Sequence, residues 1–340
     1  MEFLETPGRQ SPSAATSACA LSDVLSELLE NARLRGWVSE ESSLTTPWHI
    51  QADSKAARFY VLCQGYCRFE LEGGVAFVDL APGDLVLETR GQGHSVCNRP
   101  PNQSTSGEQV VTVDKAARRR RSVSGGGGPL TTLVYGGFVF NKDTVSLLIS
   151  SLPPFIHIAG AKGKAMPWLA ETIGLILRES DPTQPGRQAI VDRLAQVIFI
   201  QAVRSYATTL PGECHNWLAA VMDPEIGPAL GLMHSQPQRP WTVALLANRV
   251  GMSRSAFASR FKNLLSKPPQ QYLLDCRMRK ACSLLVEEEY GVKQIAGRVG
   301  YATDAAFSNA FKRWSGKAPR TYRRVALGGT DPNNDCPDRC

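Results

Sequence analysis

The sequence predicts an α+β protein of several domains, in which a small β-barrel or sandwich precedes a helical segment and an all-α domain. Three observations support this fold class. Residues 58–89 alternate apolar and polar side chains between turns. Residues 165–209 and 268–289 have helical periodicity. The pattern at 244–262 recurs at 293–312. With 340 residues and 43% hydrophobic composition, the chain is long enough for two or three domains.

The β-rich part is indicated by the segments RFYVLCQGYCRFEL, GGVAFVDL and GDLVLET. Turns are predicted at residues 72–74 and 82–84, where glycine and proline interrupt the alternation. Short strands at this spacing are typical of a small barrel or sandwich.

The ends and the cysteines indicate the class of protein and its compartment. MEFLETPGRQSPSAATSACA lacks a basic segment followed by an apolar one, and no stretch approaches the roughly 18 apolar residues of a membrane span. Nine scattered cysteines include no CxxC pair, which argues against a disulfide framework or structural zinc. We therefore expect a cytoplasmic protein.

Charge is distributed unevenly along the chain. Residues 239–324 carry 17 Lys and Arg against 5 Asp and Glu, a net charge of +12 within a chain of +7, so the remaining residues carry −5. Counterion release from a polyanion favours such a concentration. A nucleic acid is the expected partner of this region.

The repeat within the basic region has the layout of a helix-turn-helix. ALLANRVGMSRSAFASRFK and KQIAGRVGYATDAAFSNAFK share A-x-R-V-G, a short turn and F-x-x-x-F-K. Each copy predicts a helix ending at a glycine, Gly251 or Gly300, and a second helix capped by Ser253 or Thr303. The second copy has one extra residue, so its turn should differ. One such motif alone would also fit a helical hairpin with a basic face.

Between the copies, PPQQYLLDCRMRKACSLLVEEE predicts a connecting helix. A helix over 269–287 would be about 28 Å long at 1.5 Å per residue. That length would hold two reading heads about one DNA turn, ~34 Å, apart.

Residues 223–324 resemble the DNA-binding domain of AraC/XylS-type transcription regulators, through WTVALLANRVGMSRSAFASRFK, PQQYLLDCRMRKAC and VGYATDAAFSNAFKRWSGKAPRTYRR. The resemblance implies two helix-turn-helix units on seven helices. The base-facing residues that it implies are Arg254, Ser255, Ala258 and Ser259 in the first recognition helix, and Asp304, Ala305, Ser308 and Asn309 in the second. Asn309 would pair with adenine and Arg254 with guanine or a phosphate. We assign Lys262, Lys312, Arg313, Lys317, Arg320 and Arg323 to the DNA phosphates.

The run from TPWHIQ through YVLCQGYCRFELEGG to LAPGDLVLETRGQGHSV, followed by TTLVYGGFVF and SLLISSLPPFIHI, resembles the cupin-type ligand-binding domain of many AraC-type regulators. Cupins often hold a metal with a His-x-His pair, a carboxylate and a later His. His94 sits where the last ligand would fall, but Arg58, Phe59 and Tyr60 occupy the strand that should supply the first pair. We predict no bound metal and no other cofactor.

Candidate residues of an effector pocket are His49, Tyr60 and His94, and the alternative for the histidines is hydrogen bonding within the fold. Cys63, Cys67 and Cys97 are candidates for redox sensing, because some relatives sense oxidants through cupin-domain thiols, with packing as the alternative. Cys63 and Cys67 would share a face of one strand. The arginines Arg118 to Arg121 either hold a phosphate-bearing ligand or DNA, or belong to a solvated loop.

Residues 166–180 and 187–207 predict two helices. The second carries an apolar stripe of Ile190, Leu194, Val197, Ile198, Gln201 and Ala202. Relatives dimerise through helices here, and the alternative is packing against the chain's own barrel.

The expected organisation is therefore an N-terminal cupin-like β-barrel, a helical linker and an all-α double helix-turn-helix DNA-binding domain. The expected bounds are a disordered N-terminus (1–20), a sensor domain (21–160) with a flexible insertion (98–128), a linker or dimerisation region (161–222), the DNA-binding domain (223–325) and a disordered tail (326–340). The resemblance implies a transcription regulator, either an activator or a repressor, and not an enzyme. Its implied partners are promoter DNA, RNA polymerase, a small-molecule effector and a second copy of the chain. The alternatives are an architectural DNA-binding protein without an effector and a cupin enzyme with an accessory DNA-binding domain.

Overall fold

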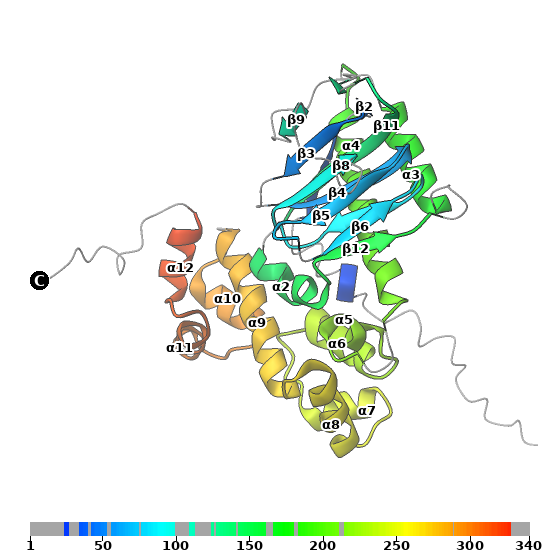
Figure 1. Cartoon of the computed structure of the whole chain (residues 1–340). Helices are drawn as coiled ribbons and strands as arrows, with labels where there is room; N and C mark the ends of the chain where they lie inside the picture. The colour runs from blue at the N-terminus through cyan, green and yellow to red at the C-terminus, as the bar shows by residue number, and fades with distance from the viewer. Residues whose placement is uncertain are drawn as a thin grey trace, which may run out of the picture. The chain divides into compact units, whose positions relative to one another are not determined.

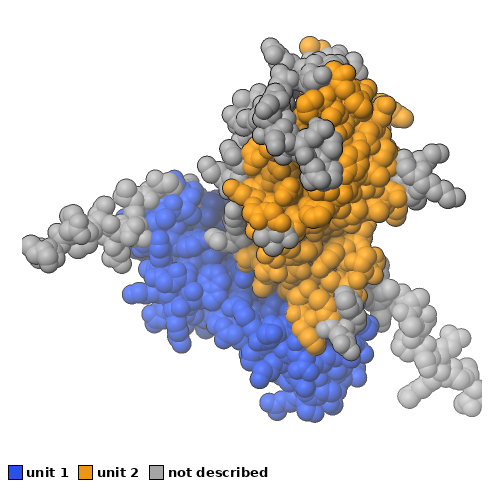
Figure 2. Space-filling model, in the orientation of Figure 1, with its two compact units in different colours: residues 1–28, 220–340 blue, residues 29–219 orange. Residues whose placement is uncertain are grey.

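A computed structural model describes residues 24–26, 34–39, 42–52, 56–74, 76–98, 109–112, 124–125, 127–140, 142–160, 166–179, 183–210, 214–287 and 289–327. The expected disordered segment 1–20, the tail beyond 327 and the run Arg118 to Arg121 lie outside these residues. The chain divides into two compact units, coloured separately in Figure 2. We call residues 29–219 the N-terminal unit, and residues 1–28 together with 220–340 the C-terminal unit, and each is described by itself.

The described strands of the N-terminal unit form two sheets (Figure 1). One has the order β10-β2-β11-β4-β7-β12, with β1 also paired to β11, and the other has the order β6-β5-β8-β3-β9. The strands are β1 (Arg35–Val38), β2 (Ser42–Thr45), β3 (Trp48–Ala52), β4 (Ala57–Gln64), β5 (Cys67–Leu71), β6 (Phe77–Leu80), β7 (Leu85–Glu88), β8 (His94–Asn98), β9 (Gln109–Thr112), β10 (Ser124–Gly125), β11 (Leu130–Val139) and β12 (Phe155–Ile158).

The core of this unit lies between the two sheets. In β3 and β5, buried residues alternate with half-buried ones, so each strand turns one face inward. Trp48, Phe69 and Val96 of the second sheet share one buried cluster with Tyr60 and Leu133 of the first. The expected fold class is confirmed, with one refinement: in the described residues the sheets stay two separate layers and do not close into a barrel.

Helices cover the other side of the first sheet. Phe59 and Phe138 lie 5.4 Å apart between ring centroids, and Phe138 lies 5.2 Å from Phe199 of α4. The helices of this unit are α2 (Lys142–Ser151), α3 (Pro167–Arg178) and α4 (Arg187–Ala207), and α5 (Trp217–Met222) spans the boundary between the units. The predicted apolar stripe of α4 therefore divides, because Ile198 and Ala202 are buried in this unit while Ile190 and Val197 are exposed.

The segment 98–128 is not a continuous loop. Its residues Gln109–Thr112 form β9, which pairs with β3 in parallel. Residues Ser124–Gly125 form β10, which pairs with β2. The expected flexible insertion therefore includes two short strands, which extend the sheet edges by backbone pairing.

The C-terminal unit is built of helices. They are α6 (Ile226–Ser235), α7 (Val243–Arg249), α8 (Arg254–Leu265), α9 (Pro269–Val286), α10 (Val292–Arg298), α11 (Asp304–Ser315) and α12 (Pro319–Ala326). The predicted connecting helix appears as α9, with Pro at its first position where no N–H bond is lost. Within the described residues, no helix is long and apolar enough to cross a membrane.

Candidate nucleic-acid interface and ligand site

The first helix-turn-helix unit consists of α7 and α8. Helix α7 ends in a Schellman arrangement, in which the N–H of Met252 donates to Ala247 O and the N–H of Gly251 donates to Asn248 O. Gly251 has φ +71, the left-handed conformation that this motif needs. The hydroxyl of Ser253 then accepts the N–H of Ala256 and caps α8.

The second unit, α10 and α11, repeats this geometry. The N–H of Tyr301 donates to Ala296 O, Gly300 has φ +83, and Thr303 accepts the N–H of Ala306. The extra residue lies between the glycine and the cap, and the cap backbone differs as expected, with φ −135 at Thr303 against −67 at Ser253.

Each recognition helix turns a phenylalanine pair inward. Phe257 and Phe261 of α8 are fully buried, and Phe261 packs on Tyr272 of α9 with 5.6 Å between ring centroids. Phe307 and Phe311 of α11 are buried in the same way. These rings fix which helix face remains outside.

The residues predicted to face DNA bases lie on that outer face. Arg254, Ser255, Ser259, Asp304, Ala305 and Asn309 are exposed, and Ala258 and Ser308 are half-buried. Their assignment to bases stays a prediction, and their exposure leaves their side chains accessible.

The residues predicted to contact phosphates differ in their surroundings. Lys262, Lys312, Arg313 and Arg320 are exposed, and Lys317 is half-buried. Arg323 instead donates from Nε to Leu285 O at 2.9 Å and from Nη2 to Tyr290 O, at the end of α9. A phosphate contact by Arg323 would have to share or replace these bonds.

Asp275, buried near the middle of α9, joins the two helix-turn-helix units. Its Oδ2 accepts from Lys267 Nζ at 2.8 Å, just after α8, and its Oδ1 accepts from Trp314 Nε1 at 3.0 Å, near the end of α11. Asp275 was not among the functional residues predicted from the sequence. The signal available was one acidic residue within the apolar stripe of a helix, because a buried carboxylate needs partners.

A second acidic group, Asp223 and Glu225, binds α8 through Arg260. Arg260 of α8 donates to Asp223 at 2.8 and 3.1 Å and lies 2.9 Å from Glu225. Burial opposes ionisation of Asp223, but Arg260 and the N–H groups of Ile226 and Glu225 hold its pKa below the ordinary value. Arg260 therefore orients the recognition helix, a role that its sequence position did not reveal.

In the N-terminal unit, Tyr60 and His94 are bonded to each other. His94 Nδ1 lies 2.8 Å from Gln92 O and must donate to that carbonyl, so Nε2 accepts from the Tyr60 hydroxyl at 2.9 Å. Burial lowers the pKa of His94 to about 4 despite the opposing bond to Gln92. The imidazole is therefore neutral at neutral pH.

A buried carboxylate shapes the loop that leads to His94. Glu88 accepts the N–H groups of Arg90, Gly91 and Gln92 at 2.8 to 3.0 Å. Burial raises the pKa of Glu88, while these three N–H groups oppose the increase. The loop conformation, and with it the position of His94, depends on this carboxylate.

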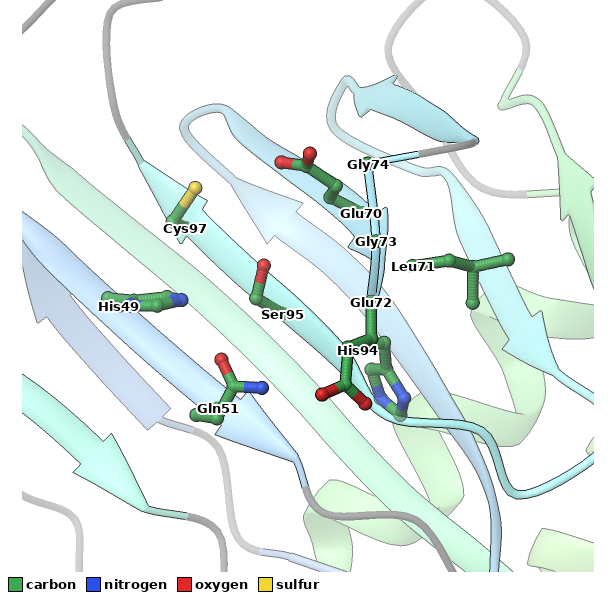
Figure 3. A pocket seen from close by; sticks show the side chains of 10 residues that line it. All are labelled: His49, Gln51, Glu70, Leu71, Glu72, Gly73, Gly74, His94, Ser95 and Cys97. Atoms are coloured by element: carbon green, nitrogen blue, oxygen red, sulfur yellow. The ribbon is translucent and has the colours of Figure 1, made fainter.

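His49 lies on the outer face of the second sheet, whereas Tyr60 of the first sheet points into the core between the sheets. The side chains of β3 alternate, and His49 is half-buried between Trp48 and Ile50, which are in the core. His49 and His94 nevertheless both line one hollow of about 300 Å³ on the outer side of the second sheet, with Gln51, Glu70, Leu71, Glu72, Gly73, Gly74, Ser95 and Cys97 (Figure 3). Tyr60 reaches this site only through its bond to His94.

The three candidate redox cysteines do not form one group. Cys63 and Cys67 belong to different strands, β4 and β5, because the chain turns between Gln64 and Cys67. Cys63 is exposed and Cys67 is buried, so the expectation of a shared face on one strand is wrong. Cys97 is half-buried on the outer side of β8, whereas Cys67 points into the core. Burial raises the pKa of the Cys67 thiol, which disfavours the reactive thiolate.

Comparisons with known proteins agree with both units. A cupin family model matches residues 23–208, and a helix-turn-helix domain model matches residues 246–325. The HTH-type transcriptional regulator AlkR of Acinetobacter baylyi is 34% identical over 272 residues, covering 78% of this chain and 87% of that protein. An AraC-like transcription regulator of Streptomyces lividans is 30% identical, covering 89% of this chain and 98% of that protein.

A further relative is the RCS-specific HTH-type transcriptional activator RclR of Escherichia coli, 27% identical over 88% of this chain and 97% of that protein. Among solved structures, the DNA-binding domain of AdpA in complex with a target DNA is 32% identical and covers 30% of this chain and 92% of that chain, with a TM-score of 0.29.

Two capped helix-turn-helix units on a basic scaffold, joined in sequence to a cupin unit, define a DNA-binding transcription regulator. The chain belongs to the AraC/XylS family of such regulators, with an N-terminal cupin domain. DNA is therefore a partner of the C-terminal unit.

Proposed function

We propose that this regulator recognises a specific DNA sequence with both helix-turn-helix units, each placing one recognition helix in the major groove. The observation that carries the proposal is the matched pair of capped units held on one helix through Asp275. Because α9 is about 27 Å long at 1.5 Å per residue, the units suit sites about one DNA turn apart.

Within this proposal, the residues on the outer faces of the two recognition helices contact different DNA bases. Asn309 pairs with adenine, Arg254 reads guanine or a phosphate, and Ala258 and Ala305 offer only apolar contact, for example to a thymine methyl. The exposed cations Lys262, Lys312, Arg313 and Arg320, together with Lys317, bind the backbone and set affinity and register.

The N-terminal unit supplies the response to an effector. A small molecule bound there shifts the balance between two arrangements of the regulator, provided that it binds one arrangement better. The hollow that His49 and His94 line is the candidate site, because its polar side chains converge on a concave surface.

The regulator acts as a cytoplasmic dimer that engages RNA polymerase as an activator. Support for the dimer comes from apolar side chains that the packing of α3 and α4 leaves exposed: Leu175 at 46%, Ile190 at 44% and Val197 at 39%. Such residues are typical of a helix that packs against a second copy. A monomeric mass in solution would contradict this part of the proposal.

The test is selection of bound sites from random double-stranded DNA by the full-length protein at physiological salt. We expect two short motifs about one turn apart, or a repeat of that pair. Enrichment of no motif would contradict specific recognition and favour an architectural DNA-binding protein, whose affinity depends on salt rather than on sequence.

A further inference from the structure

The hollow on the second sheet has a floor made of polar side chains from three strands. In the pairing register, Ser95 of β8 stands between Gln51 of β3 and Glu70 of β5. Cys97 stands between His49 and Arg68 one row further along. Figure 3 shows these side chains, Arg68 excepted, on the same side of the sheet as Glu72.

The wall of the hollow is the turn that follows β5. Its glycines have φ +92 at Gly73 and +69 at Gly74, which lets the turn bend tightly. The carboxylate of Glu72 lies directly against Gly93, where a Cβ atom would collide with it. Because Gly93 has no side chain, the carboxylate of Glu72 can occupy the space beside it.

Among the residues that the structure describes, the negative charge of the hollow has no counter-ion. The side-chain carboxylates of Glu70 and Glu72 accept no hydrogen bond and form no ion pair within these residues. The nearest arginine of the same sheet face, Arg68, is bound to Asp79 at 2.7 and 3.0 Å and lies 4.3 Å from the ring of Phe77. Its charge is already balanced, so it does not neutralise the two glutamates.

We propose that this hollow binds an aliphatic di- or polyamine. The two carboxylates accept from its ammonium groups, and Gln51 and Ser95 offer further oxygen acceptors beside them. The carboxylates attract an ammonium through its charge as well as through its hydrogen bonds, which favours it over a neutral hydroxyl of the same shape. A volume of about 300 Å³ suits a small ligand of this kind.

The site differs from the interior of the cupin fold. Trp48, Tyr60, Phe69 and Leu133 fill the space between the sheets, whereas the hollow opens on the outer side of β3, β8 and β5. The amine is thereby the class of effector that the structure assigns to the N-terminal unit, and its regulatory role rests on the proposed function.

Calorimetric titration of the full-length protein with spermidine and with 1,4-diaminobutane tests the proposal, with 1,4-butanediol as the neutral isostere. We expect both amines to bind and the diol not to bind. Glu70→Gln and Glu72→Gln should each weaken spermidine binding about tenfold or more, since one charge-assisted bond contributes about that factor. Glu171→Gln, at an exposed position of α3 in the same unit, should leave binding unchanged.

Gly93→Ala supplies an independent variant that keeps both carboxylates. Its methyl group displaces the flexible end of Glu72 and meets no backbone atom of the turn, so the fold should persist while spermidine binding weakens. The proposal is overturned if the diol binds as well as the amines, if both Gln variants bind spermidine like the parent, or if no amine binds to protein that still binds DNA.

Adding spermidine to a DNA-binding titration separates this inference from the proposed function. Amine binding that leaves the affinity for the selected DNA unchanged supports the site and contradicts the effector role. A selected DNA motif with no heat of amine binding contradicts the site and leaves specific DNA recognition standing. At constant ionic strength, the Glu70→Gln variant controls for competition of spermidine with protein for DNA phosphates.

Discussion

The two helix-turn-helix units have the same caps and turns but are held in different ways. The turn glycine of the first, Gly251, faces open space, whereas Gly300 of the second abuts the backbone of Gln238. Helix α8 is held by the ion pairs of Arg260, and α11 by the partly buried hydrogen bond from Trp314 to Asp275. The two copies of the repeat are thus stabilised by different contacts, and the second unit should tolerate fewer substitutions.

The largest difference should follow from alanine at the two turn glycines. Gly251→Ala should cost about 1–2 kcal/mol, since a side chain in the left-handed region is strained. Gly300→Ala should cost at least ~1 kcal/mol more, because its Cβ would lie 2.6 Å from Gln238 O. Urea denaturation of the full chain measures both. Equal losses of unfolding free energy would show that the contact with Gln238 relaxes without cost.

A second comparison concerns the hydrogen bonds and ion pairs that hold the two recognition helices. Asp275→Asn should cost about 1–3 kcal/mol, because a buried polar pair loses its charge assistance. Arg260→Gln should cost about 0.2–1 kcal/mol, since its side chain is 43% exposed and solvent screens its ion pairs.

The two variants should also differ in DNA selection. Asp275→Asn leaves one acceptor oxygen for the two donors Lys267 and Trp314, so one of these contacts is lost and the accepted spacing between the two DNA motifs should broaden. Arg260→Gln should leave the spacing unchanged. Identical spacing profiles for both variants would mean that α9 alone fixes the distance between the units.

Base reading should also differ between the units. Asn309 and Ser259 occupy matching positions after the first phenylalanine of each pair. Asn309→Ala should remove about 1–3 kcal/mol of discrimination at one base pair, because an amide bonds to adenine at two atoms. Ser259→Ala should remove less, since a hydroxyl offers a single weaker contact.

Lys312→Ala is the matched control for base reading. It should weaken all DNA sequences alike and reduce the slope of log affinity against log salt by about 1. Competition binding with single-base variants of the selected site measures the base discrimination of Asn309→Ala, Ser259→Ala and Lys312→Ala. Uniform loss of affinity in Asn309→Ala would contradict its base-facing assignment.

Local patterns predicted the helix-turn-helix units well, because caps, turn glycines and the phenylalanine pairs act within a few residues. The hydrogen bond from Trp314 to Asp275 joins residues 39 positions apart. The bond from Arg323 to Leu285 joins residues 38 positions apart, and no local pattern specifies such partners. In the N-terminal unit, strand alternation predicted a barrel or sandwich. It did not predict that Cys63 and Cys67 fall on either side of a turn, because four residues fit one strand or a hairpin equally well.

The smallest expected effect lies at the ends of the recognition helices. Helix α8 ends at Ser266 with φ +55, and α11 ends at Gly316 with φ +75. A serine in this conformation is strained, so Ser266→Gly should stabilise the protein by about 0.5–1 kcal/mol after the entropy of the unfolded glycine is subtracted. Gly316→Ser should destabilise it by a similar amount. Thermal unfolding of both variants would show opposite shifts in Tm, and shifts of the same sign would mean that the end of α8 is stabilised by contacts of the Ser266 side chain.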